Sequence, residues 1–172
     1  MLRIMAVMAL SLASSPAIPY SRTPTEPEAL AATMVSAHNS MRTEMGVMPM
    51  RWNAGLAADA AQWADHLAET GRFEHDVRRR SVPEGENLWM GTRDHYPVRH
   101  MVDAWGEERK VFRPGRFPDN SRTGSWHDVG HYTQIVWKDT REVGCAIARN
   151  ASDEFLVCRY AQAGNVVGES PI

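Results

Sequence analysis

Apolar side chains recur at helical spacing in two stretches of the chain. The first stripe consists of Leu30, Met34 and Met41, and the second consists of Leu56, Ala60, Trp63 and Leu67. A capping box at Thr25-Glu26-Pro27-Glu28 precedes the first stripe, and Gly46 follows it. Asn53 can cap the second stripe, and Gly71 provides a stop. We therefore predict two amphipathic helices within these limits.

A third helix is predicted to open at Pro97. Its apolar stripe consists of Val98, Met101, Trp105 and Phe112. Glu108 falls on the same face, between Trp105 and Phe112. Unless the helix ends early, the Glu108 carboxylate therefore points toward the core or toward a cavity inside it. The adjacent Glu107 is expected to be solvated.

Two β-prone runs, "VGCAIAR" and "FLVCRYA", flank the turn-like stretch "NASDE". A turn centred between Ala151 and Ser152 places Cys145 directly opposite Cys158 in an antiparallel pair. The Cα separation of such a pair is one that a disulfide can span. We therefore predict a disulfide. Two reduced, buried thiols are the alternative.

The segment 113–130 is dense in Pro, Gly, Ser, Asn and Asp, which predicts a long loop. Long loops in compact domains often carry function. Helices outnumber strands, and the strands cluster late in the chain. An α+β or layered sheet-and-helix arrangement is therefore expected.

Composition limits the partners of this chain. It has 172 residues, 43% of them hydrophobic, and a formal net charge of -2. This length suits a single domain with a sizeable core. A charge so close to neutral gives no reason to expect nucleic acid or an anionic membrane surface as a partner. No stretch approaches the roughly 20 apolar residues that a transmembrane helix requires.

The first residues have the pattern of a secretory signal. A positive charge precedes an apolar run over residues 4–12, and small residues follow that run. We assign residues 1–17 to a signal peptide, 18–28 to a linker, and 29–172 to one domain. A short hydrophobic helix of the mature fold is the alternative for the apolar run.

Several stretches resemble the motifs of one family. "GHYTQIVW", "VGCAIA" and "FLVCRYAQAGN" resemble those of the CAP superfamily, which groups cysteine-rich secretory proteins, insect venom antigen 5 and plant pathogenesis-related class 1 proteins. Further stretches agree in the family's order: "AHNSMR", "MRWNAGLAADAAQWA", "FEHD", "PEGENLWMG", "VDAWGEE" and "GNVVGESPI". The likeness covers residues 29–172, which are identified as a CAP (SCP-like) domain, and we expect a secreted bacterial member.

The resemblance implies an α+β fold, a three-layer α-β-α sandwich with a surface cavity. The family's cavity tetrad corresponds in this sequence to His75, Glu86, Glu108 and His131. The spacing in the third predicted helix independently directs Glu108 inward. Structural positions implied by the motifs are His38, Asn39, Arg42, Asn87, Gln134, Trp137, Tyr160 and Asn165. Of these, His38 lies on the apolar side of the first predicted helix, where Asn39 and Arg42 could fasten the helix to neighbouring backbone.

Two imidazoles and two carboxylates gathered in a cleft can bind a cation or share protons. Both groups are ordinary ligands of Zn²⁺ and of other divalent cations, and an ion would relieve the repulsion between Glu86 and Glu108. Without metal the four groups would titrate as a coupled set. A buried polar network that only joins helix to sheet is the alternative. We expect Gly130 to let the chain turn out of the long loop, so that His131 is held rigidly at the cavity.

Three functions fit this interpretation. The first is a secreted binding module that holds a divalent metal and a sterol, fatty acid or other small lipid in apolar grooves. The second is a metal-dependent hydrolase or protease in which Glu86 or Glu108 is the general base and His75 or His131 is the acid or a metal ligand. The third is a structural or host-interaction domain. We expect a monomer in an extracellular or periplasmic location, and the lack of a nucleophile motif favours a non-enzymatic role.

Overall fold

The computed structural model describes residues 26–78 and 81–172, so the expected signal peptide and residues 18–25 of the expected linker lie outside the described residues. The elements follow the chain in the order α1 (Glu26–Glu44), β1 (Arg51–Trp52), α2 (Ala54–Thr70), β2 (Gly85–Thr92), α3 (Val98–Gly106), η1 (Glu107–Lys110), η2 (Trp126–Asp128), α4 (Gly130–Ile135), β3 (Glu142–Arg149) and β4 (Asp153–Ala161). Within the described ranges, no helix is both long and apolar enough for a membrane crossing.

The first two helices form where the apolar stripes predict them. The Asn53 side chain accepts the backbone N–H groups of Gly55 and Leu56, and Gly71 ends α2 at a φ of 66°, in the left-handed region that favours glycine. Helix α1 already includes residues 26–28, which were predicted to belong to the linker. Pro27 fits there because the N–H groups of a first turn have no intrahelical acceptor.

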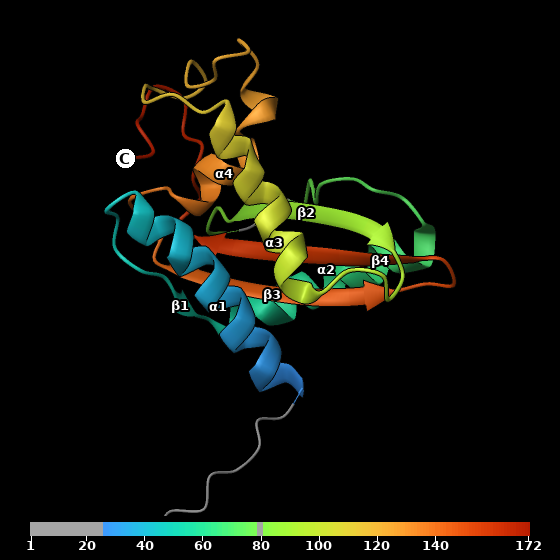
Figure 1. Cartoon of the computed structure of the whole chain (residues 1–172). Coiled ribbons are helices and arrows are strands. Elements are labelled where there is room, and N and C mark those ends of the chain that lie inside the picture. Colours follow the sequence, from blue (N-terminus) through green and yellow to red (C-terminus); the bar gives the residue numbers. More distant parts are fainter. Residues whose placement is uncertain (1–25, 79–80) are drawn as a thin grey trace, which may run out of the picture.

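One mixed sheet lies between two layers of helices. Its strand order is β1-β3-β4-β2 among the described residues, with β1 parallel to β3 and the other pairs antiparallel. Figure 1 shows α1 and α3 in front of the sheet and α2 behind it. The predicted three-layer α-β-α sandwich is therefore confirmed.

Strand β4 is covered on both faces, so its residues 154–160 are all buried. One face packs with α1, α3 and α4 through Leu156, Cys158 and Tyr160. The other face packs with α2 through Phe155 and Val157. Successive side chains of a strand point to opposite faces, so Arg159 lies on the α2 face, directly across from Glu86 on β2.

The hairpin has the predicted register. Cys145 pairs with Cys158 and Arg149 with Glu154, which centres the turn between Ala151 and Ser152. A disulfide joins the two cysteines across a Cα separation of 4.1 Å. Among the described residues no cysteine is free. The prediction of a disulfide is confirmed, and the alternative of two reduced thiols does not hold.

The third helix ends earlier than predicted. The α-helix stops at Gly106 and the chain continues as the 3-10 helix η1, so the interpretation of one helical stripe through Phe112 is wrong. Phe112 is buried in an isolated bridge to Ser121. A Cβ at position 106 would lie 2.8 Å from the Met41 sulfur, so glycine permits the close approach of α3 to α1. Glycine is also a weak helix former, which fits the end of α3 at this point.

Candidate functional site

His75 and Glu86 form the first of two histidine–carboxylate pairs. His75 lies between α2 and β2, and its Nδ1 is 2.6 Å from Oε1 of Glu86 on β2. The same oxygen accepts the backbone N–H of Asp76. The imidazole is 62% exposed, whereas the carboxylate side chain is 8% exposed. A carboxylate only accepts hydrogen bonds, so Nδ1 carries the proton of the neutral ring. Nε2 then keeps its lone pair, which does not point at Glu86.

His131 and Glu108 form the second pair in the same way. His131 is in α4, and its Nδ1 is 2.6 Å from Oε1 of Glu108 in η1. The other oxygen of Glu108 accepts the backbone N–H of Tyr132. The His131 ring stacks on Trp105, with an interplanar angle of 13°. Both rings of the expected tetrad are therefore oriented through Nδ1 by a carboxylate.

Both pairs are connected to the beginning of β2, which is an edge strand of the described sheet. Glu86 directs its side chain to the α2 face, and the next residue, Asn87, donates from Nδ2 to the backbone oxygen of His131. Among residues 26–78 and 81–172, no three His, Cys, Asp or Glu side chains are grouped closely enough to hold one metal ion. The four residues of the expected tetrad therefore form two histidine–glutamate pairs. A single cavity that all four side chains share stays a prediction.

Helix α4 is held in place by polar contacts from the last part of the chain. Asn165 donates to the Gly130 carbonyl and accepts the Thr133 hydroxyl, which is fully buried. Gln134 accepts the backbone N–H of Gly164. Gly130 starts α4 rather than a turn, and its lack of a side chain allows the Trp126 ring to approach, since a Cβ would lie 3.2 Å from that ring. The Thr133 hydroxyl thus ties α4 to Asn165 in the last part of the chain.

A buried polar chain connects α1 to the His131 backbone. His38 contacts the Met34 carbonyl oxygen through Nδ1 at 2.7 Å and the Tyr160 hydroxyl through Nε2 at 2.9 Å. The side chain of Asn87 hydrogen-bonds Tyr160 and also the His131 carbonyl. Burial lowers the pKa of His38 to about 4 and raises the pKa of Tyr160 well above its usual value. His38 is therefore neutral at pH 7.

Asn39 and Arg42 fasten α1 to distant backbone. Asn39 exchanges two hydrogen bonds with the main chain of Met50. Arg42 is fully buried, and burial lowers its pKa to about 10, so it remains charged at pH 7. Its guanidinium donates to four backbone carbonyl oxygens, those of Met48, Ile135, Trp137 and Thr140. The carbonyls of Ile135 and Trp137 lie at the end of α4, where helix carbonyls lack intrahelical partners.

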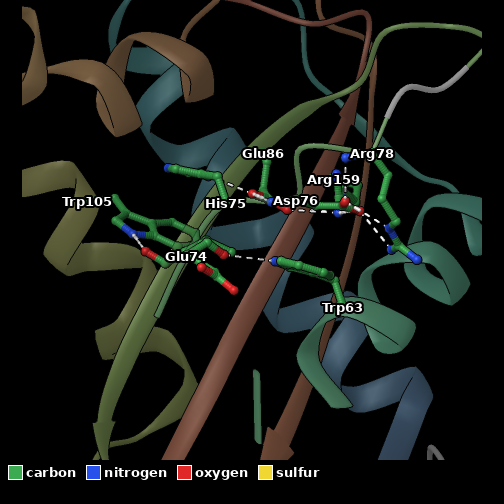
Figure 2. A network of polar contacts seen from close by, with 9 residues as sticks. Trp63, Glu74, His75, Asp76, Arg78, Glu86, Trp105 and Arg159 are labelled. Carbon is green, nitrogen blue, oxygen red and sulfur yellow. Dashed lines mark hydrogen bonds and ion pairs between the residues drawn. The ribbon is translucent and has the colours of Figure 1, made fainter. Parts of the chain in front are cut away.

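Asp76 and Arg159 lie beside the first pair (Figure 2), and neither was predicted as a site residue. Nη2 of Arg159 is 2.7 Å from Oδ2 of Asp76 and 2.8 Å from Oε2 of Glu86. Arg159 is 3% exposed and the Asp76 side chain is fully buried. One signal was available, because Arg159 is a charged residue within the apolar run "FLVCRYA", and such residues are rarely buried without partners.

Comparison with known proteins identifies the family. A model of CAP, the cysteine-rich secretory protein family, matches residues 35–160. The chain is 33% identical to pathogenesis-related protein 1B of Nicotiana tabacum over 138 residues, which are 80% of this chain and 77% of the relative. It is 34% identical to protein PRY2 of Saccharomyces cerevisiae over 80% of this chain and 38% of the relative. The chain therefore belongs to the CAP family.

Solved structures agree on the fold. The structure titled NaASP2 with Zn²⁺ matches with a TM-score of 0.70 and 22% identity, over 86% of this chain and 88% of that one. BmVAL-1 matches with a TM-score of 0.71 and 21% identity, over 89% and 84% of the two chains. The similar proteins include plant, yeast and hookworm proteins, so the expected bacterial origin is not supported.

Proposed function

We propose that this chain is a secreted binding module that holds a divalent cation through the Nε2 atoms of His75 and His131. The observation that carries the proposal is that each ring is tied through Nδ1 to a carboxylate, in the arrangement that orients metal-binding histidines. Glu86 and Glu108 would fix the rings, and water or an external ligand would complete the coordination. Bound metal would supply Lewis acidity at that position. The similar NaASP2 structure contains Zn²⁺, which supports this choice of ion.

Zinc titration of the full chain tests this proposal. We expect saturable binding that is lost in the double variant His75→Ala, His131→Ala, because both nitrogen donors are removed. Glu86→Gln should lower the affinity by about 10- to 100-fold, since it replaces the carboxylate that orients His75. His95→Ala, His100→Ala is a matched control that removes two exposed histidines outside the pairs. Unchanged zinc affinity in the double variant would count against the metal site.

A second ligand class is suggested by a groove between α1 and the sheet. It has a volume of about 780 Å³ and includes Leu30, Trp52, Val98 and Ile147. Apolar walls of this kind suit a fatty acid or a sterol, and Arg149 at the same groove offers a cation to a carboxylate head group. We propose a small lipid as its ligand.

Filling this groove should prevent lipid uptake. Ala29 lies on the groove, so Ala29→Trp is expected to reduce the binding of a fluorescent fatty acid or sterol at least tenfold, because an indole would occupy the ligand volume. Ala151→Trp at the exposed hairpin tip is the matched control and should bind as wild type does. Equal uptake by both variants, or no uptake by wild type, would exclude the groove as a lipid site.

The proposed location is extracellular. The family to which the chain belongs is described as secretory, and the disulfide between Cys145 and Cys158 requires an oxidising compartment to form and persist. We propose a monomer with the expected signal peptide over residues 1–17 and the CAP domain over residues 29–172.

A further inference from the structure

The segment that carries His75 is attached to the sheet through buried charges (Figure 2). Asp76 follows His75 directly, and its side chain oxygen Oδ2 lies 2.7 Å from Nη2 of Arg159. The same Nη2 lies 2.8 Å from Glu86 Oε2. One guanidinium nitrogen from the middle of the sheet therefore contacts both the carboxylate beside His75 and the carboxylate that hydrogen-bonds the His75 ring.

Contacts with Trp63 of α2 hold the same segment from a second element. Trp63 of α2 donates from Nε1 to the backbone oxygen of Glu74 at 3.0 Å. Arg78 binds both carboxylate oxygens of Asp76 and lies over the Trp63 ring, 5.2 Å from its centroid. Figure 2 shows these groups converging from α2, β2 and β4. Residues 74–78 are thus held from α2 and from the sheet at once.

The charges make Arg159 the central member of this network. Asp76 and Glu86 are two carboxylates with side chains that are 0% and 8% exposed, and two such groups repel each other unless a cation lies between them. Arg78 is 55% exposed and contacts only Asp76 of the two, whereas Arg159 contacts both. Without Arg159, the repulsion between the two buried carboxylates would favour their separation. That movement would disturb the hydrogen bond that His75 donates to Glu86.

We propose that Arg159 is a positioning residue for His75: its guanidinium holds Glu86 and Asp76 so that the imidazole donates through Nδ1 and presents Nε2 to a ligand. This inference deepens the proposed metal-binding function and depends on it for its consequence. In this role Arg159 acts through Glu86 and Asp76 and does not itself contact the ligand. The second pair does not include Arg159, so His131 should be independent of it.

The test is to measure the ring ¹⁵N signals of both histidines in the apo protein by NMR, in wild type and in Arg159→Met. In wild type, His75 should give the signature of a ring protonated at Nδ1. In Arg159→Met, that signature should shift toward the Nε2-protonated form that is favoured in water, while the His131 signals stay unchanged. Zinc affinity should fall about tenfold, as expected when a group that orients a ligand is disturbed.

Arg51→Met is the matched control. Arg51 is also a sheet arginine that pairs with a glutamate, Glu142, but it contacts neither histidine pair. It should leave the His75 signature unchanged. A folded Arg159→Met variant with wild-type His75 signals would overturn the inference. If Arg159→Met does not fold, Arg159→Lys decides: a partial shift of His75 supports the role, and a wild-type signature overturns it.

The two readouts separate this inference from the proposed function. If wild type binds no zinc, the metal proposal fails, yet the ring signals in the apo protein still report whether Arg159 orients His75. If zinc binds but the His75 ring signals are the same in wild type and in Arg159→Met, the metal proposal is supported and the positioning role of Arg159 is excluded.

Discussion

Replacing Arg42 with methionine is expected to lower the free energy of unfolding by about 4 kcal/mol, because several hydrogen bonds to a charged group are lost and each is worth roughly 1.5–3 kcal/mol before relaxation. Arg42 donates to four backbone carbonyl oxygens at 2.6 to 2.9 Å, and it is fully buried. Methionine fills much of the same volume without donating, so these carbonyls would lose their partner in the protein interior. Urea unfolding followed by tryptophan fluorescence measures the change.

The matched control for this prediction is Arg99→Met. Arg99 pairs with Asp103 on the exposed side of α3, and an exposed pair of this kind contributes less than about 1 kcal/mol. Arg42→Lys should fall between the two, because lysine keeps the charge but has only one nitrogen to reach the carbonyls. A change below about 1 kcal/mol in Arg42→Met would contradict the role of Arg42 as a clamp between α1 and α4.

Local signals were sufficient to predict α2 and the hairpin. The cap at Asn53 and the stop at Gly71 depend only on residues a few positions away, so the sequence was enough to predict both ends of α2. The register of Cys145 opposite Cys158 follows from the position of the turn. In these places the contacts that decide the structure are close in sequence, which is why the spacing of residues was enough.

Long-range contacts determine the two features that the sequence did not predict, strand β1 and the end of α3. Strand β1 has only two residues, and it pairs in parallel with β3, about half the chain away. Helix α3 was predicted too long because the apolar spacing continues to Phe112, whereas Phe112 pairs with the distant Ser121 in the fold. Neither pairing partner can be predicted from the spacing of residues around β1 or around Phe112.

The candidate site was predicted in part. Glu108 was expected to point inward from a helical face, and its carboxylate does meet His131, although it does so from a 3-10 helix. The residues of the tetrad were carried over from the family resemblance, whereas their division into two pairs comes from the fold. Arg159 was missed because its contact with Glu86 depends on the pairing of β4 with β2, and these two strands are far apart in the sequence.

Lowering the pH from 7 to 4 is expected to reduce the free energy of unfolding by about 3 kcal/mol through His38 alone, at about 1.4 kcal/mol for each unit of pKa difference. The pKa of His38 is about 4 in the folded protein, against 6.5 for the unfolded reference. The unfolded chain therefore takes up this proton at a higher pH than the folded chain. The full contribution is present above pH 6.5 and is lost as the pH falls toward 4.

The contacts of His38 explain the direction of this effect. The Met34 carbonyl only accepts, so Nδ1 carries the proton of the neutral ring and Nε2 accepts the Tyr160 hydroxyl. Burial is the main cause of the low pKa, and the nearby charge of Arg42 adds to it. A second proton would place a donor on Nε2 against the hydroxyl, and Tyr160 would have to give up its present hydrogen bond. The protonated ring is therefore disfavoured by its charge and by its hydrogen bonding.

The measurement compares urea unfolding of wild type and His38→Gln at several pH values. His38→Gln cannot titrate and should be less stable at pH 7, because glutamine fills the site less well. Carboxylates titrate in the same pH range in both proteins, so the difference between the two stability curves isolates the histidine. That difference should shrink by about 3 kcal/mol between pH 7 and pH 4. Parallel curves would mean that the buried ring is protonated as readily in the folded chain as in the unfolded one, and that burial does not keep His38 neutral.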